Sequence, residues 1–129
     1  MTRRKTMLIV DDEPRVLRVL SRLFKREYEV LHASDGAAAL ELARARHPDV
    51  IVTDQRMPNM TGVELLAHAR RELPNALRVL ITGFSEYSEA DPVVQQAGIH
   101  LYVEKPFSPL TLRDLVAQAF EQHAPHGEC

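Results

Sequence analysis

The chain has 129 residues, of which 45% are hydrophobic and 26% charged, and its formal net charge is −2. These values predict one globular domain with its own core, and they argue against a surface built mainly to bind nucleic acid. No apolar stretch approaches a membrane span, and the single cysteine excludes a disulfide within the chain. We therefore expect a cytoplasmic domain over residues 7–122, after a basic segment at 1–6 and before a flexible tail or linker at 123–129.

Apolar runs of strand length alternate with helical patterns five times along the chain. Continuous apolar strands are typical of parallel sheets that are covered on both faces, and helices show one apolar stripe. In chain order, the expected strand and helix pairs are 7–10 with 14–26, 28–33 with 37–46, 50–54 with 61–72, 77–82 with 92–97, and 101–104 with 109–122. This alternation predicts an α/β fold, in which helices cover both faces of a five-stranded parallel sheet.

Local signals predict where several helices begin. Asp35 and Ser108 are suited to N-cap positions, and Thr61 with Glu64 has the spacing of a capping box. Pro92 lies where the fourth helix belongs, and a proline inside a helix removes a hydrogen bond and clashes with the preceding turn. We therefore expect this helix to be short, starting at Pro92 after an irregular stretch over 85–90.

Polar side chains follow four of the expected strands. Asp11 and Asp12 follow the first strand, Asp54 ends the third, Thr82 ends the fourth and Lys105 follows the fifth. Ligands of open parallel sheets bind beyond these carboxyl ends. If the first and third strands are neighbours, three carboxylates share one pocket, which requires raised pKa values or a hard cation such as Mg²⁺. Together with the hydroxyl and the lysine, these groups suit phosphoryl transfer to an aspartate.

Four motifs at these strand ends resemble the receiver domain of bacterial two-component response regulators. They are Ile9-Val-Asp-Asp-Glu-Pro14, Thr53-Asp-Gln-Arg-Met-Pro58 with Gly62 after it, Leu80-Ile-Thr-Gly83 and Glu104-Lys-Pro-Phe107. The resemblance runs from about residue 7 to 120. It implies a flavodoxin-like, doubly wound sheet of order 2-1-3-4-5. It also implies a phosphoryl-accepting signalling module that is not an enzyme acting on an external substrate.

The resemblance implies a role for each site residue. Asp54 would be the phosphoacceptor, and Mg²⁺ would be held by Asp11, Asp12, Asp54 and the backbone carbonyl of Arg56. Lys105 would contact the phosphoryl group, and its bond to the following proline is expected to be cis. The implied phosphodonor is a sensor histidine kinase or a histidine phosphotransfer protein. The output domain or protein is not specified, and a homodimer is one option.

Further positions concern switching and access to the phosphate. By resemblance, Thr82 and Tyr102 would change conformation on phosphorylation and alter the surface of the fourth helix and fifth strand. Arg56 and Phe84 occupy positions that line access to the phosphate, and we expect them to set the lifetime of phospho-Asp54. Lys105 stands out by composition as well, because the chain has 13 arginines and only three lysines.

Other interpretations of the same residues are open from the sequence. Asp11 and Asp12 could simply cap the first helix, since acids favour helix N-termini. The site could also belong to a magnesium-dependent aspartyl-phosphate phosphatase or to a flavodoxin-like cofactor binder. Four arginines on the first helix could be a solvated face supported by nearby acids, or an edge where a kinase docks. They are Arg15, Arg18, Arg22 and Arg26.

Overall fold

The computed structural model describes residues 4–83, 88 and 90–123, and its elements alternate in the expected order. The strands are β1 (Lys5–Val10), β2 (Tyr28–Ala33), β3 (Val50–Asp54), β4 (Leu77–Thr82) and β5 (Leu101–Glu104). The helices are α1 (Pro14–Phe24), α2 (Gly36–Arg46), α3 (Gly62–Glu72), α4 (Pro92–Ala97) and α5 (Pro109–His123). None of the helices in this part of the chain is long and apolar enough to cross a membrane.

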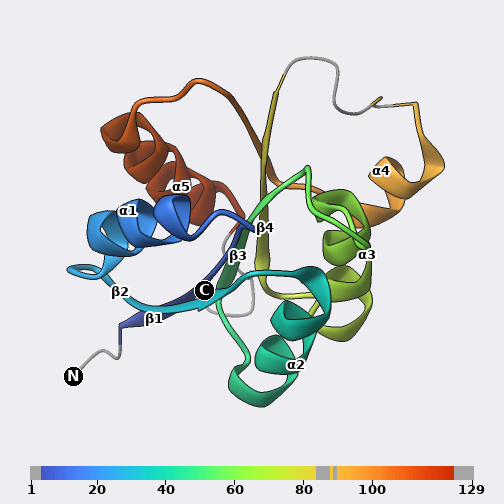
Figure 1. Cartoon of the computed structure of the whole chain (residues 1–129), viewed down its shortest axis with the longest axis horizontal. Coiled ribbons are helices and arrows are strands. Elements are labelled where there is room, and N and C mark those ends of the chain that lie inside the picture. The colour runs from blue at the N-terminus through green and yellow to red at the C-terminus, as the bar shows by residue number, and fades with distance from the viewer. Residues whose placement is uncertain (1–3, 84–87, 89, 124–129) are drawn as a thin grey trace.

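The strands form one parallel sheet of order β2-β1-β3-β4-β5, as expected. Helices α1 and α5 cover one face, and α2, α3 and α4 cover the other (Figure 1). Since a crossover connection joins each pair of parallel strands, all five strands end at the same edge of the sheet. That edge carries the polar residues singled out from the sequence.

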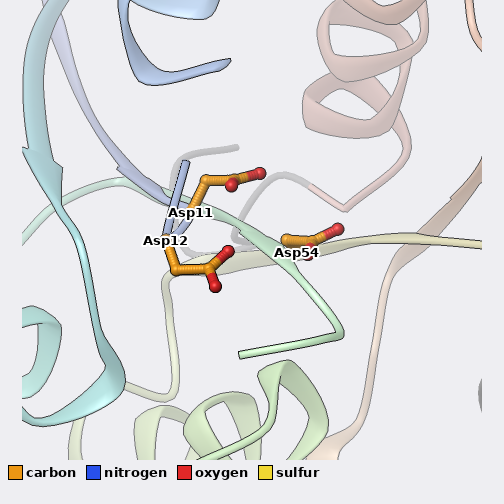
Figure 2. A group of neighbouring side chains, drawn as sticks. All are labelled: Asp11, Asp12 and Asp54. Carbon is orange, nitrogen blue, oxygen red and sulfur yellow. The ribbon is translucent and has the colours of Figure 1, made fainter. Parts of the chain in front are cut away.

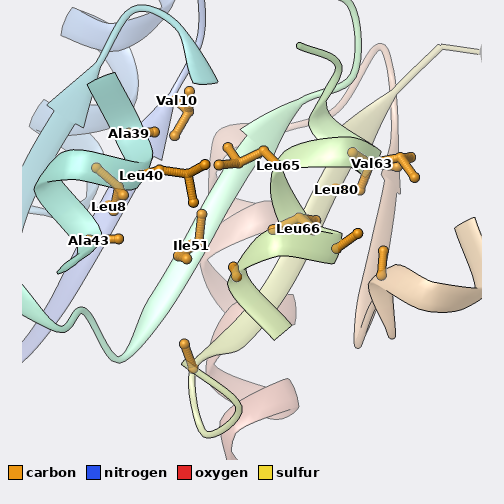
Figure 3. Packing of buried hydrophobic residues seen from close by; sticks show 14 of the residues in the cluster. Leu8, Val10, Ala39, Leu40, Ala43, Ile51, Val63, Leu65, Leu66 and Leu80 are labelled. Carbon is orange, nitrogen blue, oxygen red and sulfur yellow. The ribbon is translucent and has the colours of Figure 1, made fainter. Parts of the chain in front are cut away.

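The apolar strands supply two cores, one on each face of the sheet. In β1, Met7 and Ile9 pack under α1 and α5, whereas Leu8 and Val10 pack under α2 and α3. All four side chains are at most 1% exposed. Figure 3 shows the second of these cores, where leucines of α2 and α3 meet the sheet. Burial on both faces explains why this strand is continuously apolar instead of alternating.

Hydrogen bonds confirm the helix-start signals at Asp35 and at Thr61 with Glu64. The N–H of Ala38 donates to Asp35 Oδ1 over 2.8 Å, and Thr61 and Glu64 form the reciprocal capping box. Helix α4 has six residues with Asp91 as its N-cap, and it ends at Gly98, whose φ of 56° favours glycine. The short fourth helix is therefore confirmed. The expected irregular stretch lies mostly outside the described residues.

Some element boundaries differ from those expected. Strand β1 begins at Lys5 instead of Met7, because Thr6 exchanges hydrogen bonds with Asp49, a partner 43 residues away in the chain. Helix α1 ends at Phe24, two residues early. His123 belongs to α5, where its ring lies 4.7 Å from that of His100, whereas the sequence suggested a frayed tail.

Candidate functional site

Three carboxylates meet at the ends of β1 and β3, which are neighbouring strands. The register pairs Val10 with Thr53, so Asp11 and Asp12 emerge beside Asp54. One oxygen from each carboxylate lies within 4.8 Å of the others. Figure 2 shows the three side chains leaving the two strand ends on the same side. We call this group the acidic pocket.

Two members of the acidic pocket are buried. Asp11 and Asp54 are 7% and 5% exposed, whereas Asp12 is exposed. Burial is the main reason that the pKa of Asp11 rises to about 6, and the charges of Asp54 and Asp12 add to the rise. The Glu13 N–H, which donates to Asp11 Oδ1 over 2.8 Å, and the Lys105 charge oppose it. The pocket therefore disfavours the ionised form of Asp11.

Lys105 joins the acidic pocket to the ends of two other strands. Its Nζ lies 2.5 Å from Asp54 Oδ1, and its backbone N–H donates to the carbonyl of Thr82 over 3.0 Å. The Lys105–Pro106 peptide bond is cis, as expected. The lysine side chain is 39% exposed, so its ammonium group lies at the mouth of the pocket.

Thr82 ends β4, the strand next to β3, and Tyr102 lies on the following strand of the sheet, β5. Thr82 is 1% exposed and its Oγ1 donates to the carbonyl of Gly83 over 3.2 Å. The register places Thr82 opposite Glu104 and Tyr102 opposite Leu80. The partly buried tyrosine thus packs against the core on the α3 side, two residues before the end of its strand.

The loop from β3 to α3 is fastened by a residue to which the sequence analysis assigned no role. The Gln55 N–H donates to the carbonyl of Ile81, and its own carbonyl accepts from the Gly62 N–H, each over 3.0 Å. Its side-chain Oε1 accepts from the Val63 N–H over 2.9 Å. Helix N-termini leave N–H groups without helical partners. An amide side chain shortly before a helix start was the available signal for this role.

Gly62 allows α3 to approach the acidic pocket. A Cβ atom at this position would lie 2.3 Å from the backbone oxygen of Asp54 and 2.9 Å from Leu80 Cδ1. The same Asp54 oxygen accepts a hydrogen bond from Thr53 Oγ1 over 2.9 Å. Close packing of the helix against the last residue of β3 therefore requires glycine here.

Of the two residues expected to control access to the phosphate, the structure describes only Arg56. Arg56 is exposed and lines a hollow of about 400 Å³ beside the acidic pocket, together with Asp12 and Thr61. Phe84 lies outside the described residues. The site thus combines an all-oxygen donor set that could bind a divalent metal ion with a buried carboxylate in contact with a lysine.

Comparisons with known proteins point to one family. Residues 7–117 match the sequence profile of the response regulator receiver domain. The chain is 38% identical over 123 residues to the hydrogenase transcriptional regulatory protein HoxA of Cupriavidus necator, covering 95% of this chain and 26% of HoxA. It is 39% identical over 104 residues to the transcriptional regulatory protein KdpE of Mycobacterium tuberculosis, covering 78% of this chain and 44% of KdpE. The chain thus spans about a quarter to a half of these relatives.

Solved structures agree with this match. The chemotaxis response regulator CheY4 of Vibrio cholerae superimposes with a TM-score of 0.80 at 28% identity, covering 91% of this chain and 99% of CheY4. The similarity therefore extends over one complete domain of the same fold.

Proposed function

Since the chain belongs to the response regulator receiver domain family, we propose that Asp54 accepts a phosphoryl group from the phosphohistidine of a sensor histidine kinase or a histidine phosphotransfer protein. A receiver domain is a signalling module and not an enzyme. The observation that carries the proposal is the acidic pocket, in which Asp54 is buried and contacts Lys105 at 2.5 Å. The transfer forms an O–P bond at Asp54 and breaks the P–N bond of the donor, whose imidazole takes up a proton.

Mg²⁺ is the cofactor we propose for this reaction. Asp11, Asp12, Asp54 and the backbone carbonyl of Arg56 would hold it, since hard oxygen ligands suit this ion. When bound, the ion would neutralise charge on the transferring phosphoryl group. The ion would also offset the repulsion among the three carboxylates, which burial makes stronger.

Lys105 and Thr82 are proposed to act on the phosphorylated state. The ammonium group of Lys105, already at Asp54 Oδ1, would contact a phosphoryl oxygen. The hydroxyl of Thr82 would turn from the Gly83 carbonyl toward the phosphate, and Tyr102 would move inward. These movements would alter the surface formed by α4 and β5, for which an output domain or protein would have different affinity in the two states.

Access to phospho-Asp54 is proposed to depend on Arg56 and Phe84. Arg56 lines the hollow through which water would approach the acidic pocket. Arg56→Ala and Phe84→Ala should each have a dephosphorylation half-life that differs from that of the wild-type protein. An unchanged half-life in both variants would exclude this part of the proposal.

Acetyl phosphate with Mg²⁺ tests the proposed function, with intact mass as the readout. The wild-type protein should gain the mass of one phosphoryl group, and the gain should be absent from Asp54→Ala and from samples treated with EDTA. Asp114→Asn is the matched control, because it neutralises an exposed carboxylate of α5 that is not part of the acidic pocket. Turnover of a phosphate ester that persists in Asp54→Ala would instead support a phosphatase.

A further inference from the structure

Strand β2 forms one edge of the sheet, and β5 forms the opposite edge. Within the part of the chain that the structure describes, it pairs only with β1. The Ala33 carbonyl accepts from the Asp11 N–H over 3.2 Å and so faces β1. Because backbone directions alternate along a strand, the N–H and C=O groups of Val30 and His32 face outward.

This edge lacks the usual protection against another strand. Exposed edges are commonly blocked by lysine, proline or a bulge, whereas β2 has the sequence Tyr-Glu-Val-Leu-His-Ala over six residues. Its charged residue, Glu29, is ion-paired with Arg46 of α2. Among the residues that the structure describes, none bonds to the outward backbone groups of Val30 and His32, which can therefore pair with an added strand.

A basic groove of about 600 Å³ borders β2 on the α1 side. Its cationic residues are Arg4, Arg18, Arg22 and Lys25, and its only carboxylate is Glu29. Among the described residues, none of these four cations lies within ion-pair distance of an acid. Arg18 and Arg22 are exposed, as a solvated face of this helix requires, but no acid that the structure describes pairs with them at that distance. The groove is complementary to negatively charged side chains.

An apolar groove of about 650 Å³ borders β2 on the α2 side. From α2 it is lined by the apolar residues Leu42, Ala38 and Ala45 and by one carboxylate, Glu41. It shares Leu17 and His32 with the basic groove. Both grooves therefore border β2, the first lined mainly by α1 and the second mainly by α2. Figure 1 shows the ribbon of β2 between those of α1 and α2.

We propose that the β2 edge binds an extended segment of a partner protein in which acidic and apolar residues alternate. An added strand directs successive side chains to opposite faces of the sheet. Its acidic side chains would enter the basic groove and its apolar side chains the apolar groove, while its backbone pairs with Val30 and His32. A second copy of this chain fits poorly, because pairing two β2 edges would bring two basic grooves together.

A labelled octapeptide of alternating Glu and Val tests this proposal by fluorescence anisotropy. Arg18→Glu should weaken binding by at least about tenfold, because it removes a groove cation and adds an acid. Arg15→Glu is the matched control, since it makes the same change at an exposed residue of α1 that does not line the groove. It should bind like the wild-type protein.

Two further arms separate strand pairing from attraction between opposite charges. A peptide N-methylated on alternate residues should bind at least about tenfold more weakly, because it cannot complete the backbone ladder. Bound peptide should slow hydrogen exchange at the amides of Val30 and His32. Equal binding of the methylated peptide, displacement by single-stranded DNA or anionic vesicles, or dimerisation through β2 would each overturn the proposal. None of these measurements requires a phosphorylated protein.

Discussion

Charged side chains are buried at both ends of the sheet. They carry opposite charges at the two ends, and different neighbouring groups stabilise them. At the amino end of β4, Arg78 is 5% exposed and donates to the backbone carbonyls of Gly98, Ala76 and Pro74 over 2.8, 3.1 and 3.3 Å. At the carboxyl end, Asp11 and Asp54 share a pocket with a third carboxylate. The arginine is satisfied by fixed backbone groups, whereas Asp54 contacts the ammonium group of Lys105, a side chain that is 39% exposed. The first arrangement stabilises the fold, and the second forms a donor set that could hold a metal ion.

The two ends also titrate in opposite directions. Burial lowers the pKa of Arg78, and burial together with the Arg78 charge lowers the pKa of His100 to about 4. Burial and neighbouring carboxylates raise the pKa of Asp11 to about 6. Acidification between pH 6 and 4 therefore disfavours the folded state at one end of the sheet and favours it at the other.

The largest expected effect comes from the amino end. Arg78→Met should lower the free energy of unfolding by about 3 kcal/mol, because buried carbonyls lose their donors. Arg70→Met is the control, since Arg70 also donates to backbone carbonyls, those of Gln95 and Gln96, but is exposed. Urea denaturation measures both variants. Equal losses in the two would contradict a special role for the buried cation.

Replacing a buried charged residue at the carboxyl end of the sheet should instead raise the free energy of unfolding. In metal-free protein at about pH 8, Asp11→Asn should raise the free energy of unfolding by about 1 kcal/mol, allowing for solvent screening. The raised pKa means that the ionised carboxylate destabilises the fold above about pH 6, so the gain should shrink as the pH falls below that value.

Added Mg²⁺ sharpens this prediction. The ion should raise the melting temperature of the wild-type protein and have little effect on Asp11→Asn, because binding stabilises only a folded state that retains the site. If Asp11→Asn were less stable than the wild-type protein at every pH, the ionised carboxylate would stabilise the fold, which would contradict this prediction.

His100 gives a smaller effect that is visible only in acid. Its Nδ1 accepts from the Arg78 N–H over 2.9 Å, and asparagine can supply an acceptor in its place. Because the folded pKa is depressed, the unfolded chain binds more protons between pH 6.5 and about 4, and the wild-type protein loses stability across that window. Over the same pH range, His100→Asn should lose about 1 kcal/mol less stability than the wild-type protein, allowing for solvent screening. Thermal unfolding across this pH range measures how the stability of each protein depends on pH. The same dependence in both would contradict a depressed pKa of His100 in the folded state.

Lys105→Arg should have the smallest effect on stability and a clear effect on signalling. A planar guanidinium is wider and more rigid than an ammonium group, so it should not follow a phosphoryl oxygen at Asp54 as closely. We expect the variant to accept phosphate but to show a reduced change in the amide spectra of Thr82 and β5. Lys25→Arg is the control, and a full spectral change in Lys105→Arg would argue against a specific need for lysine.

Much of this fold was predictable because its signals are local. Strands buried on both faces leave continuous apolar runs, and Asp35, Thr61 and Asp91 mark helix starts through side chains that bond to nearby N–H groups. The carboxyl ends of parallel strands lie at one edge, and the family resemblance implied that β1 and β3 are neighbours there, so the acidic pocket could be predicted. The start of β1 depends on Asp49, a distant partner, and for that reason it was placed two residues late.

Arg78 and Gln55 were missed for a related reason. Arg78 lies within an apolar strand, and one of its acceptors, the Gly98 carbonyl, is 20 residues further along the chain. Gln55 bonds to Ile81 and to the start of α3. Every residue except proline carries the same backbone donor and acceptor, so residue type does not show which distant backbone group a buried polar side chain will bond to. The edge-strand grooves likewise depend on how α1 and α2 pack beside β2.

The contact between Gly62 and the Asp54 carbonyl also bears on how this domain can evolve. Every other amino acid carries a Cβ, which would lie 2.3 Å from that oxygen. The glycine codon at this position therefore has no neutral neighbour among missense changes, although its side chain takes part in no chemistry. In a library of all single substitutions selected for signalling, position 62 should be as depleted of variants as position 54.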